Sequence, residues 1–309
     1  MAWRDLKGAA PQPRLEPPGG AVFGLRVLAS GSSGNATLLY VPGSRAGMPA
    51  RLSLIDAGLS PTRTRALLAA DGLRTLQIDD IIYTHLDRDH AHLGWRKSGQ
   101  CRAVARLHRR HISRAEREGH AFRRTEPFED VARLGPSVTL ETVLSLHDRL
   151  GVSVLRFTIE TERGRATLGF ATDVGSVERA WTDHLAGVDA LAIESNYCPE
   201  LQTASDRPAF LKARIMGGAG HLSNGESARA ASAIVPRTEL LLLHLSRQCN
   251  TPARAVAAHG TARGRVTVSS QQRPTEWIWV HPSRAAVSTP CAEGASAQLG
   301  LFEGSARRG

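Results

Sequence analysis

Several short apolar runs in this chain end abruptly in histidine or aspartate, and this repeated pattern constrains the fold more than any other feature. The run IIYT leads into HLDRDH, LSL into His147, GFAT into Asp173 and LLLL into His244. Short apolar runs bounded by turn-forming residues are typical of buried strands. Because strand ends meet at one rim of a sheet, the polar residues that follow them can converge on a single pocket.

The rest of the chain alternates between strand and helix patterns. FGLRVLAS and ATLLYV are β-rich runs separated by the turn-forming GSSGN, which predicts a hairpin-like pair, and RLSLIDAG predicts a third strand. Ser60 and Pro61 supply the N-cap and first-turn proline of a helix through about Ala70. Further strands are expected within 101–107, 152–160, 165–173, 188–195, 239–246, 265–270 and 276–281, and helices within 108–118, 224–235 (capped by Ser223 or Asn224) and 252–260. The pattern fits a mixed α/β sandwich.

At 309 residues the chain could form one large domain or two ordinary ones. Residues 1–20 are proline-rich and are expected to be a disordered leader, 21–281 the folded domain, and 282–309 a flexible tail rich in Ala, Ser and Gly. No apolar stretch approaches the ~20 residues that cross a bilayer, and the N-terminus lacks the apolar core of a secretory signal. The cysteines are scattered, at Cys101, Cys198, Cys249 and Cys291. We therefore expect free thiols, no membrane association and, by default, a cytoplasmic location.

The chain is strongly basic, with a formal net charge of +10 carried almost entirely by arginine. Ten of its Arg and Lys residues, against two Glu, lie within 96–124, directly after the histidine-rich loop. This segment predicts an approach path for a nucleic-acid backbone. A solvated helix face, or an arginine bias from GC-rich coding, explains the same charges.

The loop HLDRDH has the composition of a metal site. Imidazole and carboxylate are the ligands expected for zinc, manganese or iron. Residues at i, i+2, i+4 and i+5 (His85, Asp87, Asp89 and His90) can present two groups to one ion and two to its neighbour, and an aspartate from another strand can bridge them. A solvated polar loop is the alternative for the loop alone, and a satisfied polar residue is the alternative for His147 alone.

At these residues the chain resembles the metallo-β-lactamase superfamily, and within it the YycJ/WalJ-like group of phosphodiesterases and nucleases. The matching segments occur in the family's order over about residues 22–280: VLASGSSGNATLLY, LIDAGLS, THLDRDH, LHD, GFATDVG, DALAIESN, RIMGGAGHLSN and LLLHLSRQCNTPARA. GSSGNAT and GHLSN are specific to this group. The resemblance implies an αββα four-layer sandwich of two mixed sheets flanked by helices.

The resemblance also implies a set of site residues. A first divalent ion would be surrounded by His85, Asp87, His147 and Asp173, and a second by Asp89, His90, His244 and again Asp173. His221, in GHLSN, stands where tRNase Z-like relatives place a proton donor to the leaving group. A histidine that only precedes a helix cap is the alternative for His221.

Asp87 departs from the family pattern, in which the loop reads HxHxDH. Aspartate can ligate zinc, so the site is retained, but three aspartates would now offset three of the four charges of two divalent ions. The lower net charge favours harder metals such as manganese or iron beside zinc. Flavodiiron proteins of the same fold carry a glutamate here, which is compatible with a dimetal centre.

The implied activity is hydrolysis of a phosphodiester in DNA or RNA by a metal-activated water, with Asp89 orienting or accepting a proton. Ser32, Ser33, Asn35 and Asn224 are candidate substrate contacts. The glycines of GSSGN fit either a phosphate-binding loop or a plain turn. Asp56, Asp148 and Glu194 are candidate acceptors for the N–H groups of ligand histidines.

Two other functions stay open. The same scaffold supports cleavage of a thioester, a lactone or a small phosphodiester. A non-catalytic nucleic-acid binder that has lost full metal occupancy through Asp87 is the second alternative. The sequence contains no GxSxG motif, which disfavours a serine hydrolase.

Overall fold

The computed structural model describes residues 15–44, 47–73, 78–97, 102–120, 122, 124–146 and 149–282, without the side chains of Arg96 and Lys97. Most of the expected leader and nearly all of the expected tail lie outside these residues, as do His147 and Asp148. The predictions made for them therefore stay predictions.

The first sheet contains seven strands in the order β14-β1-β2-β3-β4-β5-β6. Its strands are β1 (Phe23–Ala29), β2 (Ala36–Val41), β3 (Arg51–Ile55), β4 (Asp80–Tyr83), β5 (Val104–His108), β6 (Thr125–Phe128) and β14 (Ile278–Val280). β1 and β2 form the expected antiparallel pair around GSSGN. From β3 to β6 the strands run parallel, so their carboxyl ends lie at one end of the sheet.

The second sheet also has seven strands, in the order β13-β12-β11-β10-β9-β8-β7. They are β7 (Val131–Arg133), β8 (Val138–Ser145), β9 (Val152–Thr161), β10 (Gly164–Ala171), β11 (Ala190–Glu194), β12 (Glu239–Leu243) and β13 (Arg265–Val268). β10 to β13 are parallel. β7, β8 and β9 form an antiparallel meander that ends in β10.

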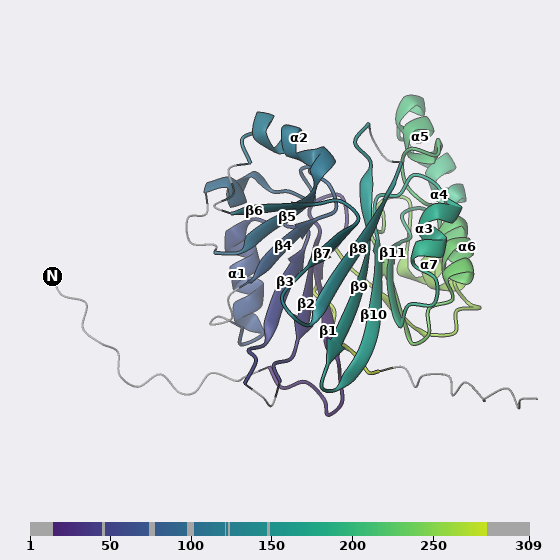
Figure 1. The fold of residues 1–309 in the computed structure, drawn as a ribbon. Coiled ribbons are helices and arrows are strands. Elements are labelled where there is room, and N and C mark those ends of the chain that lie inside the picture. Colours follow the sequence, from purple (N-terminus) through teal and green to yellow (C-terminus); the bar gives the residue numbers. More distant parts are fainter. Residues whose placement is uncertain are drawn as a thin grey trace, which may run out of the picture.

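Helices cover the outer faces of the two sheets (Figure 1). They are α1 (Pro61–Ala70), α2 (Ile112–Arg117), α3 (Arg179–His184), α4 (Pro199–Ala204), α5 (Ala209–Met216), α6 (Asn224–Ile234) and α7 (Pro252–Ala258), with 3₁₀ turns η1 (Leu93–Lys97) and η2 (Arg109–His111). α1 and α2 lie on the side of the first sheet, and α3, α6 and α7 on the side of the second. The arrangement is the predicted αββα sandwich.

Three apolar layers hold the sandwich together. The first layer lies between the two sheets and contains the fully buried side chains of Leu25, Ile82 and Phe157. A second layer joins the first sheet to its helices, and a third, around Trp181 and Ile234, joins the second sheet to α3 and α6. Strands of a sheet that is buried on both faces have continuous apolar sequences. This explains the runs IIY in β4, ALAI in β11 and LLLL in β12.

Helix ends follow the sequence signals closely. Ser60 caps α1 by accepting a hydrogen bond from the Arg63 backbone N–H, and Ser223, rather than Asn224, caps α6 in a capping box with Glu226. The helix expected over 108–118 is divided into η2 and α2. His108 is the reason, because its side chain accepts from the Arg110 N–H and caps the 3₁₀ turn first.

Candidate metal centre

Five strand ends deliver polar residues to one end of the sandwich. In the first sheet β3 leads into Asp56, and β4 into Thr84 and His85. In the second sheet β10 leads through Thr172 to Asp173, β11 ends in Glu194, and β12 leads into His244. Side chains at the carboxyl ends of parallel strands line the crevice beyond the sheet, which is where this fold class places its sites.

The backbone is strained at three of these positions. Asp56, Asp173 and His244 have φ angles of 56°, 54° and 55°, in the left-handed region that non-glycine residues rarely adopt. Such a conformation costs of order 1–3 kcal/mol per residue and persists where the surrounding structure enforces it. It turns each side chain sharply off its strand and into the crevice, and three such residues at one place indicate a functional site.

The side chains form three overlapping groups whose ligand atoms lie within 4.8 Å of one another. They are His85, His90 and Asp173; Asp89, His90 and His244; and Asp173, Glu194, His221 and His244. Every histidine and aspartate of the predicted ligand set that the structure describes, except Asp87, belongs to at least one group.

Asp173 lies at the middle of the cluster. Its Oδ2 is 3.7 Å from His85 Nε2 and also contacts His90 Nε2, whereas its Oδ1 is 2.5 Å from His244 Nδ1. One carboxylate therefore faces two sets of histidines with two different oxygens. Because the predicted ligand sets place His85 at one ion and His90 at the other, Oδ2 of Asp173 stands between ligands of both ions.

Asp56 and Thr84 orient the histidines from behind. Asp56 Oδ2 lies 2.7 Å from His90 Nδ1, and the carboxylate also accepts from the Thr84 N–H and hydroxyl. Thr84 Oγ1 in turn lies 3.0 Å from His85 Nδ1. Hydrogen bonds to the outer ring nitrogen leave Nε2 directed into the cluster, which is how ligand histidines are commonly held.

Asp87 has a partner that its sequence neighbourhood does not reveal. Arg114 of α2 donates through Nη2 to Asp87 Oδ1 at 2.8 Å, and through Nε to Glu118 at 2.8 Å. The other carboxylate oxygen, Asp87 Oδ2, faces His85 Nε2 at 3.7 Å. The aspartate thus points one oxygen at the arginine and one at the cluster.

Glu194 is fully buried and holds the opposite side. Its Oε1 accepts from the Leu222 N–H at 3.0 Å, while its Oε2 lies 3.1 Å from His221 Nδ1 and 3.6 Å from His244 Nδ1. His221 Nδ1 is also 3.1 Å from Asp173 Oδ1. Glu194 and Asp56 therefore each lie at hydrogen-bond distance from a histidine ring nitrogen, as expected of candidate acceptors, whereas Asp148 lies outside the described residues.

The buried charges displace the pKa values of the cluster. Burial alone would lower the pKa of each histidine, but the carboxylates of Glu194 and Asp173 raise that of His221 to about 10, and Asp173 raises that of His244 to about 9. The pKa of His90 is raised well above its usual value by Asp173 and Asp56. Against the effect of its own burial, His244 and His90 hold the pKa of Asp173 well below its usual range.

The donor set fits a divalent metal. His244 Nε2 is buried and makes no hydrogen bond among the described residues, and Asp89 Oδ2 lies 3.7 Å from it and 3.7 Å from His90 Nε2. Two ligands that each stand about 2.1 Å from one ion are separated by roughly 3–4 Å. The observed separations of 3.7 Å lie in this range and are too long for hydrogen bonds. A buried imidazole nitrogen without a hydrogen bond, with a carboxylate at this distance, is an environment that a divalent cation satisfies.

The GSSGN loop packs against the HLDRDH loop (residues 85–90), called the metal loop below. Asn35 N donates to the Asp89 carbonyl at 2.7 Å, its Oδ1 accepts from Gly31 N, and its Nδ2 lies 2.9 Å from His90 Nε2. Ser30 Oγ accepts from His244 N at 2.8 Å. Asn35 is thus buried within the loop, whereas Ser32 and Ser33 are exposed beside it.

Asn224, the fourth predicted substrate contact, lies in a buried polar network. Its side chain accepts from Ser195 Oγ at 2.7 Å and exchanges hydrogen bonds with Asn250, whose Nδ2 also donates to the Ser195 carbonyl. The network ties the start of α6 to the end of β11, and through them positions Glu194 and His221.

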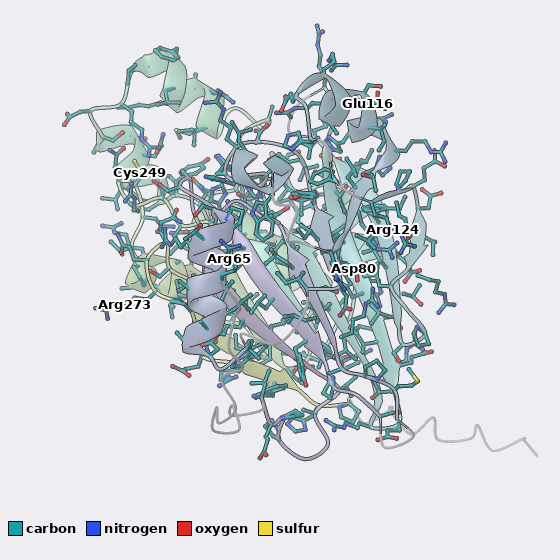
Figure 2. All side chains as sticks on the ribbon, turned by 90° about the vertical axis from the view of Figure 1, so that its left-hand side faces the viewer. Arg65, Asp80, Glu116, Arg124, Cys249 and Arg273 are labelled. Atoms are coloured by element: carbon teal, nitrogen blue, oxygen red, sulfur yellow. The ribbon has the colours of Figure 1, made fainter. Side chains whose placement is uncertain are left out.

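The arginine-rich segment forms β5, η2 and α2. Arg106 is buried and pairs with Asp80 and Glu126, Arg114 pairs with Asp87, and Arg109 pairs with Glu129. Asp80 begins β4, an inner strand of the first sheet, and Arg124 directly precedes β6 at the edge of that sheet; both are labelled in Figure 2. Several of these charges are therefore neutralised within the protein, which reduces the positive field that the sequence predicts.

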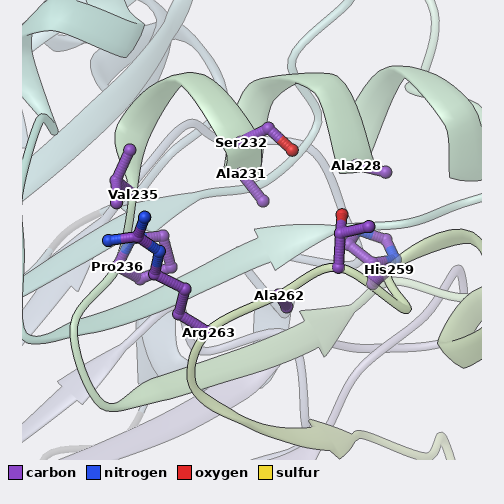
Figure 3. Close-up of a pocket in the computed structure, with 9 residues that line it drawn as sticks. Ala228, Ala231, Ser232, Val235, Pro236, His259, Ala262 and Arg263 are labelled. Carbon is purple, nitrogen blue, oxygen red and sulfur yellow. The ribbon is translucent and has the colours of Figure 1, made fainter.

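Two pockets lie outside the ligand cluster itself. One, of about 360 Å³, adjoins His221 and is also lined by Ser32, Arg207, Arg214 and Ser246. The other, of about 270 Å³, lies between the carboxyl end of α6 and the loop after α7, around Pro236, His259 and Arg263 (Figure 3). Residues of the ligand cluster line only the first of these two.

Sequence reasoning did not find three features of this region. Arg114 was part of a charge run, with no signal for its pairing to Asp87. Arg207 lies in a stretch with no recognised motif, and Arg214 opens the matching segment RIMGGAGHLSN, in which only His221 and Asn224 were given a role. Asn35 carried a signal, the group-specific GSSGN, but its buried role depends on the position of His90 in space.

No helix among the described residues is long and apolar enough to cross a membrane. Among relatives, an exodeoxyribonuclease WalJ from Streptococcus pneumoniae is 29% identical over 246 residues, which cover 74% of this chain and 83% of that protein. An exodeoxyribonuclease YycJ from Bacillus anthracis is 29% identical over 238 residues, covering 72% and 83%.

Solved structures show the same fold. The metallo-β-lactamase fold protein YhfI from Bacillus subtilis superposes with a TM-score of 0.59 at 16% identity, covering 82% of this chain and 99% of that one. Zn²⁺-bound PqqB from Methylobacterium extorquens gives 0.56 at 14% identity, covering 82% and 99%. Residues 51–245, which contain the strand ends and all the described cluster residues, match the family described as the Beta-lactamase superfamily domain. The chain therefore belongs to the β-lactamase superfamily, with a divalent-metal site at the carboxyl ends of its parallel strands.

Proposed function

We propose that this protein is a phosphodiesterase that acts on DNA and depends on two divalent metal ions. The observation that carries the proposal is the position of Asp173, whose Oδ2 faces both His85 Nε2 and His90 Nε2, the ligands proposed for different ions. The two relatives at 29% identity are named as exodeoxyribonucleases, which supports DNA over RNA. The chain's net charge of +10 suits a polyanionic substrate.

The proposal assigns each ligand to an ion. One ion would be held by His85, Asp87, Asp173 and His147, of which His147 lies outside the described residues. The second would be held by Asp89, His90, His244 and Asp173. Two ions in such a site lower the pKa of water and polarise a phosphoryl oxygen. Zinc suits this mixture of nitrogen and oxygen ligands, and manganese or iron is compatible with its four carboxylate contacts.

Residues around the ions would orient the substrate and move protons. Asp89 is partly exposed and faces the crevice, which suits a group that positions water or accepts its proton. His221 carries a proton at neutral pH in the metal-free protein and is 23% exposed, which suits a donor to the leaving oxygen. Ser32 and Ser33 are the candidate direct contacts with the strand, whereas Asn35 and Asn224 would act by holding His90 and the start of α6.

The proposal includes a cytoplasmic location, with which the buried free thiols of Cys198 and Cys249 are compatible. It also includes phosphate contacts from exposed arginines of the 96–124 segment, such as Arg110 and Arg117. A backbone contact of this kind weakens steeply as the salt concentration rises. DNA binding that is unchanged between low and high salt would contradict that part.

Metal content and diester hydrolysis, measured on the same preparation, test the proposal. We expect two ions per chain, and cleavage of bis-p-nitrophenyl phosphate that EDTA abolishes and added zinc, manganese or iron restores. One ion or none, with no turnover under any of the three metals, would contradict it and favour a nucleic-acid-binding protein. Two ions with hydrolysis of thioesters or lactones, but not diesters, would assign a different reaction to the same centre.

A further inference from the structure

The pocket beside His221 has an unusual charge. Arg207 and Arg214 line it, and none of its lining residues is acidic. Elsewhere in the structure arginines such as Arg51, Arg106, Arg114 and Arg265 pair with carboxylates. Neither Arg207 nor Arg214 makes an ion pair with any part of the chain that the structure describes. The pocket therefore carries two positive charges that the protein itself does not neutralise.

Arg207 is held in place by neutral acceptors. Its Nε donates to Gln248 Oε1 at 3.0 Å, Nη1 to Gln202 Oε1 at 3.1 Å, and Nη2 to Ser246 Oγ at 3.1 Å. A guanidinium has five N–H groups, so two remain for a ligand. Because three hydrogen bonds already fix the side chain, an anion would bind it with little further loss of conformational freedom.

Ser246 adds a buried donor to the same pocket. It is only 5% exposed, and its Oγ accepts from Arg207 Nη2 and from Cys249 N. Within the described residues its own hydroxyl proton has no acceptor. A fixed arginine, a second arginine and a buried hydroxyl, with no carboxylate, form a site for a compact anion with several acceptor oxygens, which is the chemistry of phosphate.

The pocket adjoins the metal centre at His221. His221 lines the pocket and places Nδ1 3.1 Å from Asp173 Oδ1. Ser246 follows the predicted ligand His244 by two residues, and Asn196, another lining residue, donates to the His244 carbonyl at 2.7 Å. A ligand in the pocket and a diester at the metals would thus both lie beside His221.

We propose that this pocket is a subsite for a second phosphate of the nucleic-acid strand, next to the phosphate that is cleaved. This inference rests on the proposed function, since the second phosphate has meaning only beside a diester site. The subsite selects strands in which a terminal or internal phosphate reaches Arg207 and Arg214 while the scissile diester is at the metals. Small diesters without a second phosphate lack this contact.

Equilibrium binding tests the subsite without turnover. The probes are thymidine 3′,5′-bisphosphate and the two thymidine monophosphates, measured by calorimetry with the metal-loaded protein. A charge-assisted arginine contact gives about a 10-fold gain in affinity or more. We expect the bisphosphate to bind at least that much more tightly than the better monophosphate, and the gain to be lost in Arg214→Gln and Arg207→Lys. Equal affinities in the wild-type protein would overturn the proposal.

Matched variants separate the pocket from general electrostatics. Arg214 is exposed, so its substitution should not disturb the packing of the interior. Arg207→Lys keeps the positive charge but removes the guanidinium group that three hydrogen bonds hold in place. Lys212→Gln removes a positive charge from the same helix, α5, at a side chain that binds the Thr203 carbonyl outside the pocket. The gain should persist in Lys212→Gln. An equal loss in all three variants would show long-range attraction instead of a subsite.

Kinetics identify which phosphate is used. The substrates are thymidine 3′-p-nitrophenyl phosphate and its 5′ isomer, each with and without a phosphate on the other hydroxyl. For each isomer and each variant, kcat/KM with that phosphate is divided by kcat/KM without it. A ratio of about 10 or more for one isomer, reduced towards 1 in Arg214→Gln, places the subsite on that side of the scissile bond. A ratio near 1 for both isomers contradicts the subsite while diester hydrolysis stands. Preferential binding of the bisphosphate without hydrolysis of any diester contradicts the proposed function and supports the pocket.

Discussion

Arg114 Nη2 donates to Asp87 Oδ1 at 2.8 Å, and this pair stands where the family loop has a neutral histidine. An aspartate and an arginine together carry no net charge, so the pair restores the electrostatic balance that the substitution alone would change. The three aspartates of the predicted ligand set therefore lower the net charge of the centre by less than the sequence alone suggests. Both side chains are partly exposed, which moderates the effect through solvent screening.

The pairing predicts that Arg114 acts on metal binding through Asp87. In Arg114→Gln, Asp87 should lose its orientation and metal affinity should fall, by about 10-fold if one charged hydrogen bond is lost. In Asp87→His, the same substitution of Arg114 should have little effect. Competition titration against a chromophoric chelator, with metal content by mass spectrometry, measures both. Equal losses in the two backgrounds would show that Arg114 acts independently of Asp87, and identical metal content and preference in Asp87→His would remove any special role for the aspartate.

Substitution of His221 and substitution of His244 are expected to have different effects on metal content and activity. His244→Ala removes a predicted ligand, so both metal content and activity should be lost. His221→Ala should retain both ions and slow diester hydrolysis by about 10²–10⁴-fold, the usual contribution of a general acid. The slowing should be smaller for p-nitrophenol, which leaves without a proton, than for an alkoxide leaving group. Comparable loss of metal in the two variants would make His221 a ligand instead.

The metal-free protein should be most stable at mildly acidic pH. The pKa values of His221 and His244 are about 10 and about 9 in the folded protein, above ~6.5 in an unfolded chain. Their stabilising effect is complete below about pH 6.5 and is lost as the pH rises through the folded values. The pKa of Asp173 is displaced downwards, so its effect is present above about pH 4 and lost on further acidification.

Thermal unfolding with EDTA should therefore give the highest Tm between about pH 4 and 6.5, with a decline towards pH 9–10. With saturating zinc the trend should reverse above pH 6.5, because ligand histidines must lose their protons before they bind metal. Parallel profiles with and without zinc would show that His244 does not bind it.

Gly58 should be intolerant of any side chain. A Cβ there would meet the Asp89 carbonyl oxygen at 1.7 Å and Asn35 N at 2.6 Å, both backbone atoms that cannot rotate away. Gly58→Ala is expected to displace the metal loop, to lower metal content and to reduce Tm by several degrees. Gly225→Ala in α6 is the control, since its Cβ would meet only Arg229 Nη1 at 3.9 Å and alanine favours the helix. A normal metal content in Gly58→Ala would show that the loop adapts.

Local signals in the sequence determined most of the fold. The apolar runs of β4, β11 and β12, the Ser60-Pro61 start of α1 and the Ser223 cap of α6 are each readable within a few residues, because hydrophobic burial and capping act over short distances. The match of residues 51–245 to the superfamily agrees with the fold that the motifs predicted. The short α4 and α5 carried no comparable signal.

The candidate site likewise has one part that the sequence predicts and another that it does not. That His85, Asp89, His90, Asp173 and His244 follow strand ends is visible in the sequence, since strand termini of parallel sheets share one edge. Other features depend on contacts between residues far apart in the chain. They are the histidines that each oxygen of Asp173 faces, the pairing of Arg114 with Asp87, and the pocket that Arg207 and Arg214 line with Ser246. Only the packing of two sheets and their helices brings those groups within bonding distance, so only the tertiary structure decides them.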